Sequence, residues 1–240
     1  MMTKLDILAI GAHPDDVELG CGGTLAKMVA SNKKVGILDL TQGELGTRGT
    51  FETRKIEAEK SIEILGISIR ENLKFRDGFF INDEKHQIEI IKIIRKYKPT
   101  IILANAIADR HPDHGKASKL VYDSCFLSGL RKIKTEINNI EQENWRPKHL
   151  FNYIQWNEDK PDFIIDISEY LDKKTEACMA YKSQFYDPES QEPITPITSK
   201  NFKKSIIYRA ENLGRLIGTD AGEGFTSPQW IGLKDFENFV

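Results

Sequence analysis

Short apolar runs alternate with longer amphipathic segments through the first 128 residues, and this alternation constrains the fold more than any other feature. Apolar runs of four to seven residues are typical of buried strands, and segments of ten or more residues with helical spacing are typical of helices. Their alternation predicts an α/β fold with a mostly parallel sheet. The expected strands are 5–10, 34–40, 72–75 and 100–104, and the expected helices are 20–30, 51–65, 83–97 and a fourth that ends near Ser128.

The pattern is looser from residue 129 onward, but no linker or internal repeat separates the two halves. We therefore expect one domain over 1–240, in which 1–128 carries the core of the sheet and 129–240 completes it. Ser168 is a candidate helix cap because its hydroxyl can accept from a free backbone N–H. The further expected elements are strands at 149–156 and 163–165 and helices at 168–181 and 199–216, with a proline-containing loop at 187–198 between the helices.

Charge and cysteine content exclude several classes of function. The chain has 34 basic and 36 acidic residues, whereas a nucleic-acid-binding protein normally has a basic excess or patch. Its cysteines, Cys21, Cys125 and Cys178, form no CxxC pair, which favours a reducing compartment over a disulfide framework. No apolar stretch reaches the length of a membrane span or a signal-peptide core. We expect a cytoplasmic protein that binds neither nucleic acid nor membrane.

Two polar segments follow the first and fourth expected strands. Residues 12–24 read A-H-P-D-D-V-E-L-G-C-G-G-T, and residues 109–114 read D-R-H-P-D-H. In an open parallel sheet with the common order 3-2-1-4-5, strands one and four are neighbours, and ligands bind beyond their carboxyl ends. The two segments are therefore expected to meet in space, although about 100 residues separate them in the sequence.

A bound divalent metal explains these segments better than a nucleotide does. A dinucleotide site requires G-x-G-x-x-G, of which only Gly11 is suitably placed, and two adjacent carboxylates would repel a pyrophosphate. Imidazole and carboxylate ligands suit zinc, and a catalytic zinc site keeps one position for water. His13, Asp16 and His114 can supply three ligands, which leaves Asp15 as a general base. Each motif alone could be a turn or a helix start, and it is their combination that favours a metal.

Both segments resemble the signature motifs of the LmbE/PIG-L-type zinc N-acetylglucosamine deacetylases, and the resemblance covers essentially the whole chain. It implies a Rossmann-like three-layer sandwich, one zinc per chain and hydrolysis of an acetamide on glucosamine. Fe2+ is an alternative ion, since such sites accept several divalent metals. The resemblance also implies a small-molecule amino-sugar substrate and a homo-oligomer, with a hexamer as one candidate.

The resemblance assigns a role to each matched position. His13, Asp16 and His114 correspond to the zinc ligands, Asp15 to the general base, and His111 to the histidine that stabilises the tetrahedral intermediate. Two explanations of Asp113 remain open. Its carboxylate would either hold the tautomer of a histidine or occupy the start of a helix, where the macrodipole favours it.

Further segments resemble the bacillithiol-pathway deacetylases in particular. They are residues 41–50 and 218–225, although Gly222 stands where that pattern usually has Ala. Those enzymes act on N-acetylglucosaminyl malate, and a dianionic malate favours contacts with arginine. We expect the substrate-binding residues to be Arg54, Arg110, Glu44, Glu223 and Tyr186. Each of these residues also has an alternative explanation. Arg54 could be an exposed helix residue, the two glutamates could be solvated side chains, and Tyr186 could be a packing residue.

Two other functions fit the same motifs. One is deacetylation of a different N-acetylglucosamine compound, such as a chitin oligomer. The other is a non-catalytic sugar-binding protein that the metal only stabilises. Phosphoester hydrolysis would favour two metals bridged by carboxylates, so a metal count separates it from the zinc deacetylase.

Overall fold

A seven-stranded sheet forms the centre of the computed structural model, which describes residues 3–233 and 235. The strand order is β3-β2-β1-β4-β7-β9-β8. The first five of these strands run parallel, and β9 pairs antiparallel with both β7 and β8. The strands are β1 (Ile7–Gly11), β2 (Val35–Thr41), β3 (Ile69–Phe75), β4 (Ile101–Ala104), β7 (His149–Tyr153), β8 (Phe163–Asp166) and β9 (Gly222–Thr226).

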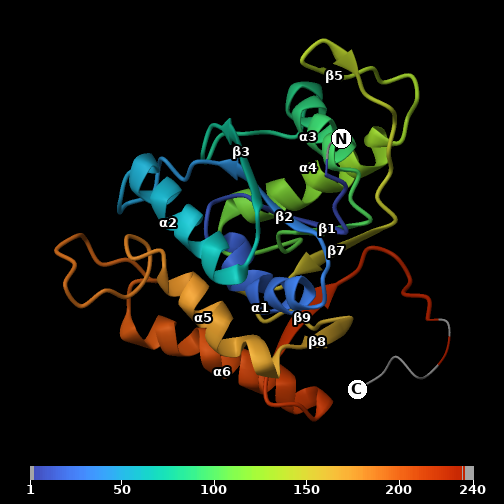
Figure 1. Cartoon of the computed structure of the whole chain (residues 1–240). Coiled ribbons are helices and arrows are strands. Elements are labelled where there is room, and N and C mark those ends of the chain that lie inside the picture. The colour runs from blue at the N-terminus through green and yellow to red at the C-terminus, as the bar shows by residue number, and fades with distance from the viewer. Residues whose placement is uncertain (1–2, 234, 236–240) are drawn as a thin grey trace.

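Helices cover both faces of the sheet, as Figure 1 shows, with α3 and α4 on one face and α1, α5 and α6 on the other. A small hairpin of β5 (Glu136–Ile137) and β6 (Ile140–Glu141) lies apart from the sheet. The predicted α/β sandwich with a mostly parallel sheet is therefore confirmed. The helices are α1 (Asp16–Ala30), α2 (Phe51–Leu65), α3 (Glu84–Tyr97), α4 (Pro112–Ser128), α5 (Leu171–Met179) and α6 (Lys200–Ile217), with a 3-10 turn, η1, over Ser168–Tyr170.

The two largest clusters of the core are apolar layers, one on each face of the sheet. Successive side chains of a strand point to opposite faces. Leu8 and Ile10 of β1 accordingly belong to the cluster that includes α3 and α4, whereas Ile7 and Ala9 belong to the cluster that includes α1. All five residues of β1 are buried, which is why its sequence is a continuous apolar run.

The predicted elements agree with the structure most closely in the first half of the chain. The helix expected over 51–65 has those bounds, with Thr50 as its cap. The helix expected over 168–181 is instead a 3-10 turn, η1, followed by α5, which ends at Met179. The hydroxyl of Ser168 donates to Asp166 and does not cap α5. The sequence did not predict β9, because its two glycines are unfavourable in strands and it pairs with distant segments.

The neighbouring position of β1 and β4 is the part of the fold that matters most for the site. Their register pairs Ile7 with Ile101 and Ala9 with Leu103. The loops after both strands consequently leave the same edge of the sheet side by side, as predicted. No helix among the described residues combines the length and the hydropathy that crossing a bilayer requires.

Candidate active site

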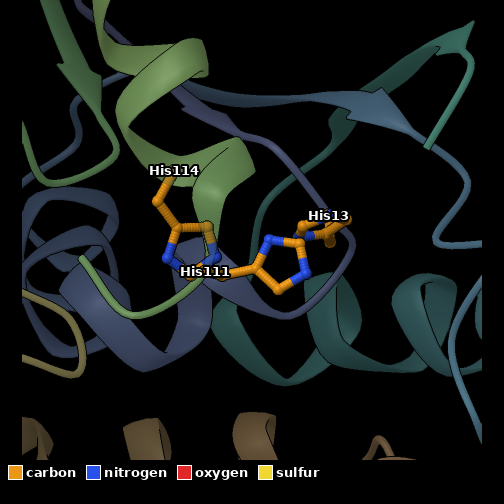
Figure 2. A group of neighbouring side chains, drawn as sticks. All are labelled: His13, His111 and His114. Atoms are coloured by element: carbon orange, nitrogen blue, oxygen red, sulfur yellow. The ribbon is translucent and has the colours of Figure 1, made fainter. Parts of the chain in front are cut away.

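The three residues predicted to hold a metal lie together at the carboxyl edge of β1 and β4. His13 follows β1, Asp16 is the first residue of α1, and His114 lies in the first turn of α4. One carboxylate faces both rings, because His114 Nε2 lies 3.0 Å from Asp16 Oδ1 and His13 Nδ1 lies 3.5 Å from Asp16 Oδ2. Figure 2 shows the two rings with that of His111, which comes from the same segment as His114.

The other nitrogen of each imidazole is bound to a carboxylate outside this group. His114 Nδ1 lies 2.5 Å from Asp109 Oδ2, and His13 Nε2 lies 2.9 Å from Asp77 Oδ1. A carboxylate at this position fixes the tautomer and orientation of a metal-binding histidine. Each ring is thereby held with its remaining nitrogen toward Asp16. Asp77 and Asp109 are not among the site residues predicted from the sequence.

Asp16 is fixed by the backbone of His13 and by two side-chain amides that follow β4 and β7. Its Oδ2 accepts from the His13 N–H at 2.9 Å and from Asn105 Nδ2 at 3.0 Å, and its Oδ1 accepts from Gln155 Nε2 at 2.9 Å. Asn105 also accepts from the Ala12 N–H at 2.9 Å, which ties the two loops together. The carboxylate therefore has little freedom to rotate away from the histidines.

The charges around the cluster of His13, Asp16 and His114 make it suitable for a cation. Burial lowers the pKa of His13 and of His114, but surrounding carboxylates outweigh it, so the pKa of His13 is raised well above its usual value and that of His114 to about 9. The pKa of Asp16 is lowered, since the nearby histidines outweigh its burial. Buried negative charge that holds protons on two histidines can equally be balanced by a metal ion, which would displace those protons.

Two groups among the described residues bring possible ligand atoms within 4.8 Å of one another. One is His13, His111 and His114, and the other is His13, Asp77 and Asp113. The second group is less suitable, because Lys116 Nζ lies 3.0 Å from Asp113 and already supplies positive charge there. The first group faces a cleft, described below, and His114 of this group adjoins Asp16, so the donor set on that side fits one divalent ion.

Asp15 has an unusual backbone conformation beside this cluster. Its φ of 119° lies in the region that non-glycine residues rarely adopt, and such strain is found most often at functional sites. Burial raises the pKa of the Asp15 carboxyl to about 7, although Arg54, with Nη2 at 3.6 Å, opposes the shift. A carboxyl with a pKa near 7 can exchange a proton at neutral pH.

His111 lies at the cap of α4, against the other two histidines. Its ring centroid is 4.7 Å from that of His13 and 5.3 Å from that of His114. Burial and the two neighbouring histidines lower the pKa of His111. Its Nδ1 accepts from the Asp113 N–H at 3.3 Å, which leaves the ring proton on Nε2. A neutral His111 can therefore still donate a hydrogen bond.

The position of Asp113 fits both explanations that the sequence left open. It lies in the first turn of α4, as a dipole-favoured carboxylate would. Its Oδ2 also lies 3.4 Å from His13 Nε2 and accepts from the Gly78 N–H at 2.8 Å. Asp113 is thus placed to support His13 together with Asp77.

A cleft of about 740 Å³ opens over the cluster. Arg54, Arg110 and Glu223 line it, whereas Glu44 and Tyr186 are not among its lining residues. Glu44 instead accepts from the Asp77 N–H at 2.8 Å. The guanidinium of Arg110 lies 4.5 Å from the ring centre of Trp156, another lining residue, so a cation and an aromatic ring are presented together at the wall of the cleft.

Comparison with known proteins identifies the family of the chain. A diacetylchitobiose deacetylase from Thermococcus kodakarensis is 31% identical over 191 residues, which cover 75% of this chain and 70% of that protein. The family model PIG-L, described as GlcNAc-PI de-N-acetylase, matches residues 8–125. The chain belongs to the PIG-L family.

Two more proteins extend the similarity beyond the matched PIG-L segment. The crystal structure of the conserved protein TT1542 from Thermus thermophilus superposes with a TM-score of 0.84 at 36% identity, covering 96% of this chain and 98% of that one. A probable N-acetyl-alpha-D-glucosaminyl L-malate deacetylase 2 from Bacillus anthracis is 25% identical, covering 77% of this chain and 84% of that protein. The similarity to TT1542 covers both halves of the chain.

The PIG-L motifs do not contain the residues that support the cluster from other strands, yet the sequence carries a signal for them. Asn105 directly follows β4, Gln155 comes two residues after β7, and Asp77 comes two residues after β3. Since the carboxyl ends of parallel strands share one edge, polar residues just beyond them are candidates for the same site. Applied to the predicted strands, this rule selects Asn105 and Asp77. It misses Gln155, because the strand expected over 149–156 extends past that residue.

Proposed function

We propose that this protein is a zinc-dependent deacetylase of N-acetylglucosamine conjugates, with His13, Asp16 and His114 as the ligands of one ion. The main support is the arrangement of these residues. The buried carboxylate of Asp16 faces one nitrogen of the His13 ring and one of the His114 ring. The other nitrogen of each ring is held by a second carboxylate, from Asp77 or Asp109. The cleft above them supplies room for a sugar conjugate.

Zinc, when bound, supplies a Lewis acid that polarises the acetyl carbonyl and makes water acidic enough to react near neutral pH. Asp15 accepts the proton of the attacking water, a role that its raised pKa supports. His111 donates from Nε2 to the oxygen on which negative charge develops. The carbon–nitrogen bond then breaks, the amine takes up a proton, and acetate and the free glucosamine leave.

Within this class, the substrate we favour is N-acetylglucosaminyl malate in bacillithiol biosynthesis. Arg110 is a suitable partner for the malate, because it lies on the wall of the cleft against Trp156. Arg54 lies next to Asp15, so it would act at the acetamide end of the substrate and not on the malate. The name of the Bacillus anthracis relative agrees with malate, whereas that of the Thermococcus relative favours diacetylchitobiose as the alternative.

The test is a substrate panel with metal analysis on one preparation. Purified protein is loaded with zinc, and acetate release is measured with N-acetylglucosaminyl malate, N-acetylglucosamine and diacetylchitobiose. We expect about one zinc per chain, the highest kcat/KM on the malate conjugate, and loss of acetate release in Asp15→Asn. Equal rates on all three would remove the malate assignment. Zinc binding and sugar binding without acetate release would favour the non-catalytic sugar-binding protein.

A further inference from the structure

Helix α1, which begins with Asp16, is interrupted at Cys21. The backbone there has φ −146° and ψ 19°, so α1 consists of a first piece up to Gly20 and a second piece from Gly22 to Ala30. In an unbroken helix the Gly23 N–H would donate to the Leu19 carbonyl, four residues earlier. Both of these groups have other partners here.

A buried ion pair takes up the backbone groups at the interruption. The Gly23 and Thr24 N–H groups donate to the two oxygens of Glu223, at 3.0 and 2.7 Å. Lys174 Nζ donates to the Leu19 carbonyl at 2.8 Å and to Glu223 at 2.5 Å. The cation therefore lies at the carboxyl end of the first piece and the anion at the amino end of the second, as the two helix dipoles require.

Both pieces of α1 pack closely against neighbouring side chains at their glycines. A Cβ on Gly20 would lie 2.1 Å from the ring of Tyr153, and one on Gly23 would lie 2.6 Å from Ile167. Each piece thus approaches a different neighbour closely. Asp16 is the first residue of the short first piece, so the placement of that piece bears on where its carboxylate lies.

We propose that Lys174 and Glu223 are positioning residues that hold the interruption in α1 and thereby direct Asp16 toward His13 and His114. Both oxygens of Glu223 are occupied by this task, which differs from the sugar contact predicted from the sequence. Lys174 is 4% exposed and Glu223 is 2% exposed, so solvent does not supply the missing partners if either is removed. The inference rests on the proposed function, because it concerns the orientation of a proposed metal ligand.

The experiment measures zinc affinity by competition with a chelator, together with kcat and KM, in Glu223→Gln and in Lys174→Met. We expect zinc affinity to fall roughly tenfold or more, as when other groups that orient a metal ligand are removed. We also expect kcat to fall while KM changes little. Lys27→Met is the matched control, because Lys27 joins the second piece of α1 to Asp166 away from the interruption. It should retain wild-type zinc affinity.

The reversed pair, Lys174→Glu with Glu223→Lys, tests whether the two residues matter for their placement at the helix ends or only because they form a salt bridge. It restores opposite charges but places each at the wrong helix end, so zinc affinity should stay low. Recovery of wild-type affinity would overturn the inference, and so would unchanged affinity and kcat in Glu223→Gln. If the reversed pair fails to fold by circular dichroism, Glu223→Gln, which alters neither size nor shape, decides the question. A wild-type chain that binds no zinc would overturn the proposed function instead.

Discussion

The guanidinium of Arg54 lies 3.6 Å from the carboxylate of Asp15, and both side chains are buried. The sequence favours Arg54 as a partner of the malate, because arginine suits a dianion. Its position beside Asp15 instead links it to the proposed general base. An arginine can thus act either at the acetamide end of the cleft, beside Asp15, or at the end that would hold the malate. Kinetics with different substrates can separate these two roles.

Replacement of Arg54 is expected to slow the reaction with every substrate. Arg54→Gln removes the positive charge beside Asp15 and allows that carboxylate to move, and small displacements of a reacting group cost about a hundredfold in rate. We expect kcat to fall by that order on both the malate conjugate and diacetylchitobiose. Steady-state kinetics measure this, and a change in KM for the malate conjugate alone would return Arg54 to the malate site.

Replacement of Arg110 is expected to affect anionic substrates selectively. A hydrogen bond to a charged group contributes about 1.5–3 kcal/mol, which corresponds to roughly a 10- to 150-fold increase in KM for the malate conjugate in Arg110→Gln. KM for diacetylchitobiose should change little. Arg146→Gln is the matched control, since Arg146 also lies over an aromatic ring, that of Phe126, but does not line the cleft. An equal effect of Arg110→Gln on both substrates would argue against a malate contact.

The carboxylates behind the histidines are expected to control metal affinity. Asp109→Asn weakens the hold on His114, and Asp77→Asn weakens the hold on His13. Loss of such a partner usually lowers metal affinity about 10- to 100-fold, which chelator competition can measure. Asp123→Asn removes a carboxylate that pairs with Lys119 on α4, and its affinity should equal that of the wild type. Wild-type affinity in both Asp109→Asn and Asp77→Asn would show that the histidines do not bind the ion through the nitrogens that face Asp16.

The sequence predicted the parts of this site that depend on local order and on sheet topology. His13 and Asp16 follow one strand and His114 follows another, so the neighbouring position of β1 and β4 was enough to bring them together. Asn105 and Gln155 follow strands in the same way, but no motif surrounds them to indicate their role.

Other features depend on contacts that no local pattern encodes. Glu223 meets Gly23, 200 positions earlier in the chain, through a strand, β9, that its glycines made hard to recognise. The position of Arg54 beside Asp15 likewise depends on how α2 packs against α1. A charged residue that is buried by tertiary packing looks the same in the sequence as one on the surface. This is why the sequence left both Arg54 and Glu223 open between an exposed side chain and a site residue.

Metal removal should lower thermal stability, because an ion that binds only the folded chain stabilises it by mass action. At a free zinc concentration about 100 times the dissociation constant, this contribution is about 2.7 kcal/mol. For a chain of this size, that corresponds to a rise in Tm of roughly 5–10 °C over the chelator-treated protein. Differential scanning calorimetry with zinc and with chelator measures the shift. His114→Ala should show little of it, because one of three ligands is absent, whereas a full shift in that variant would exclude His114 from the metal site.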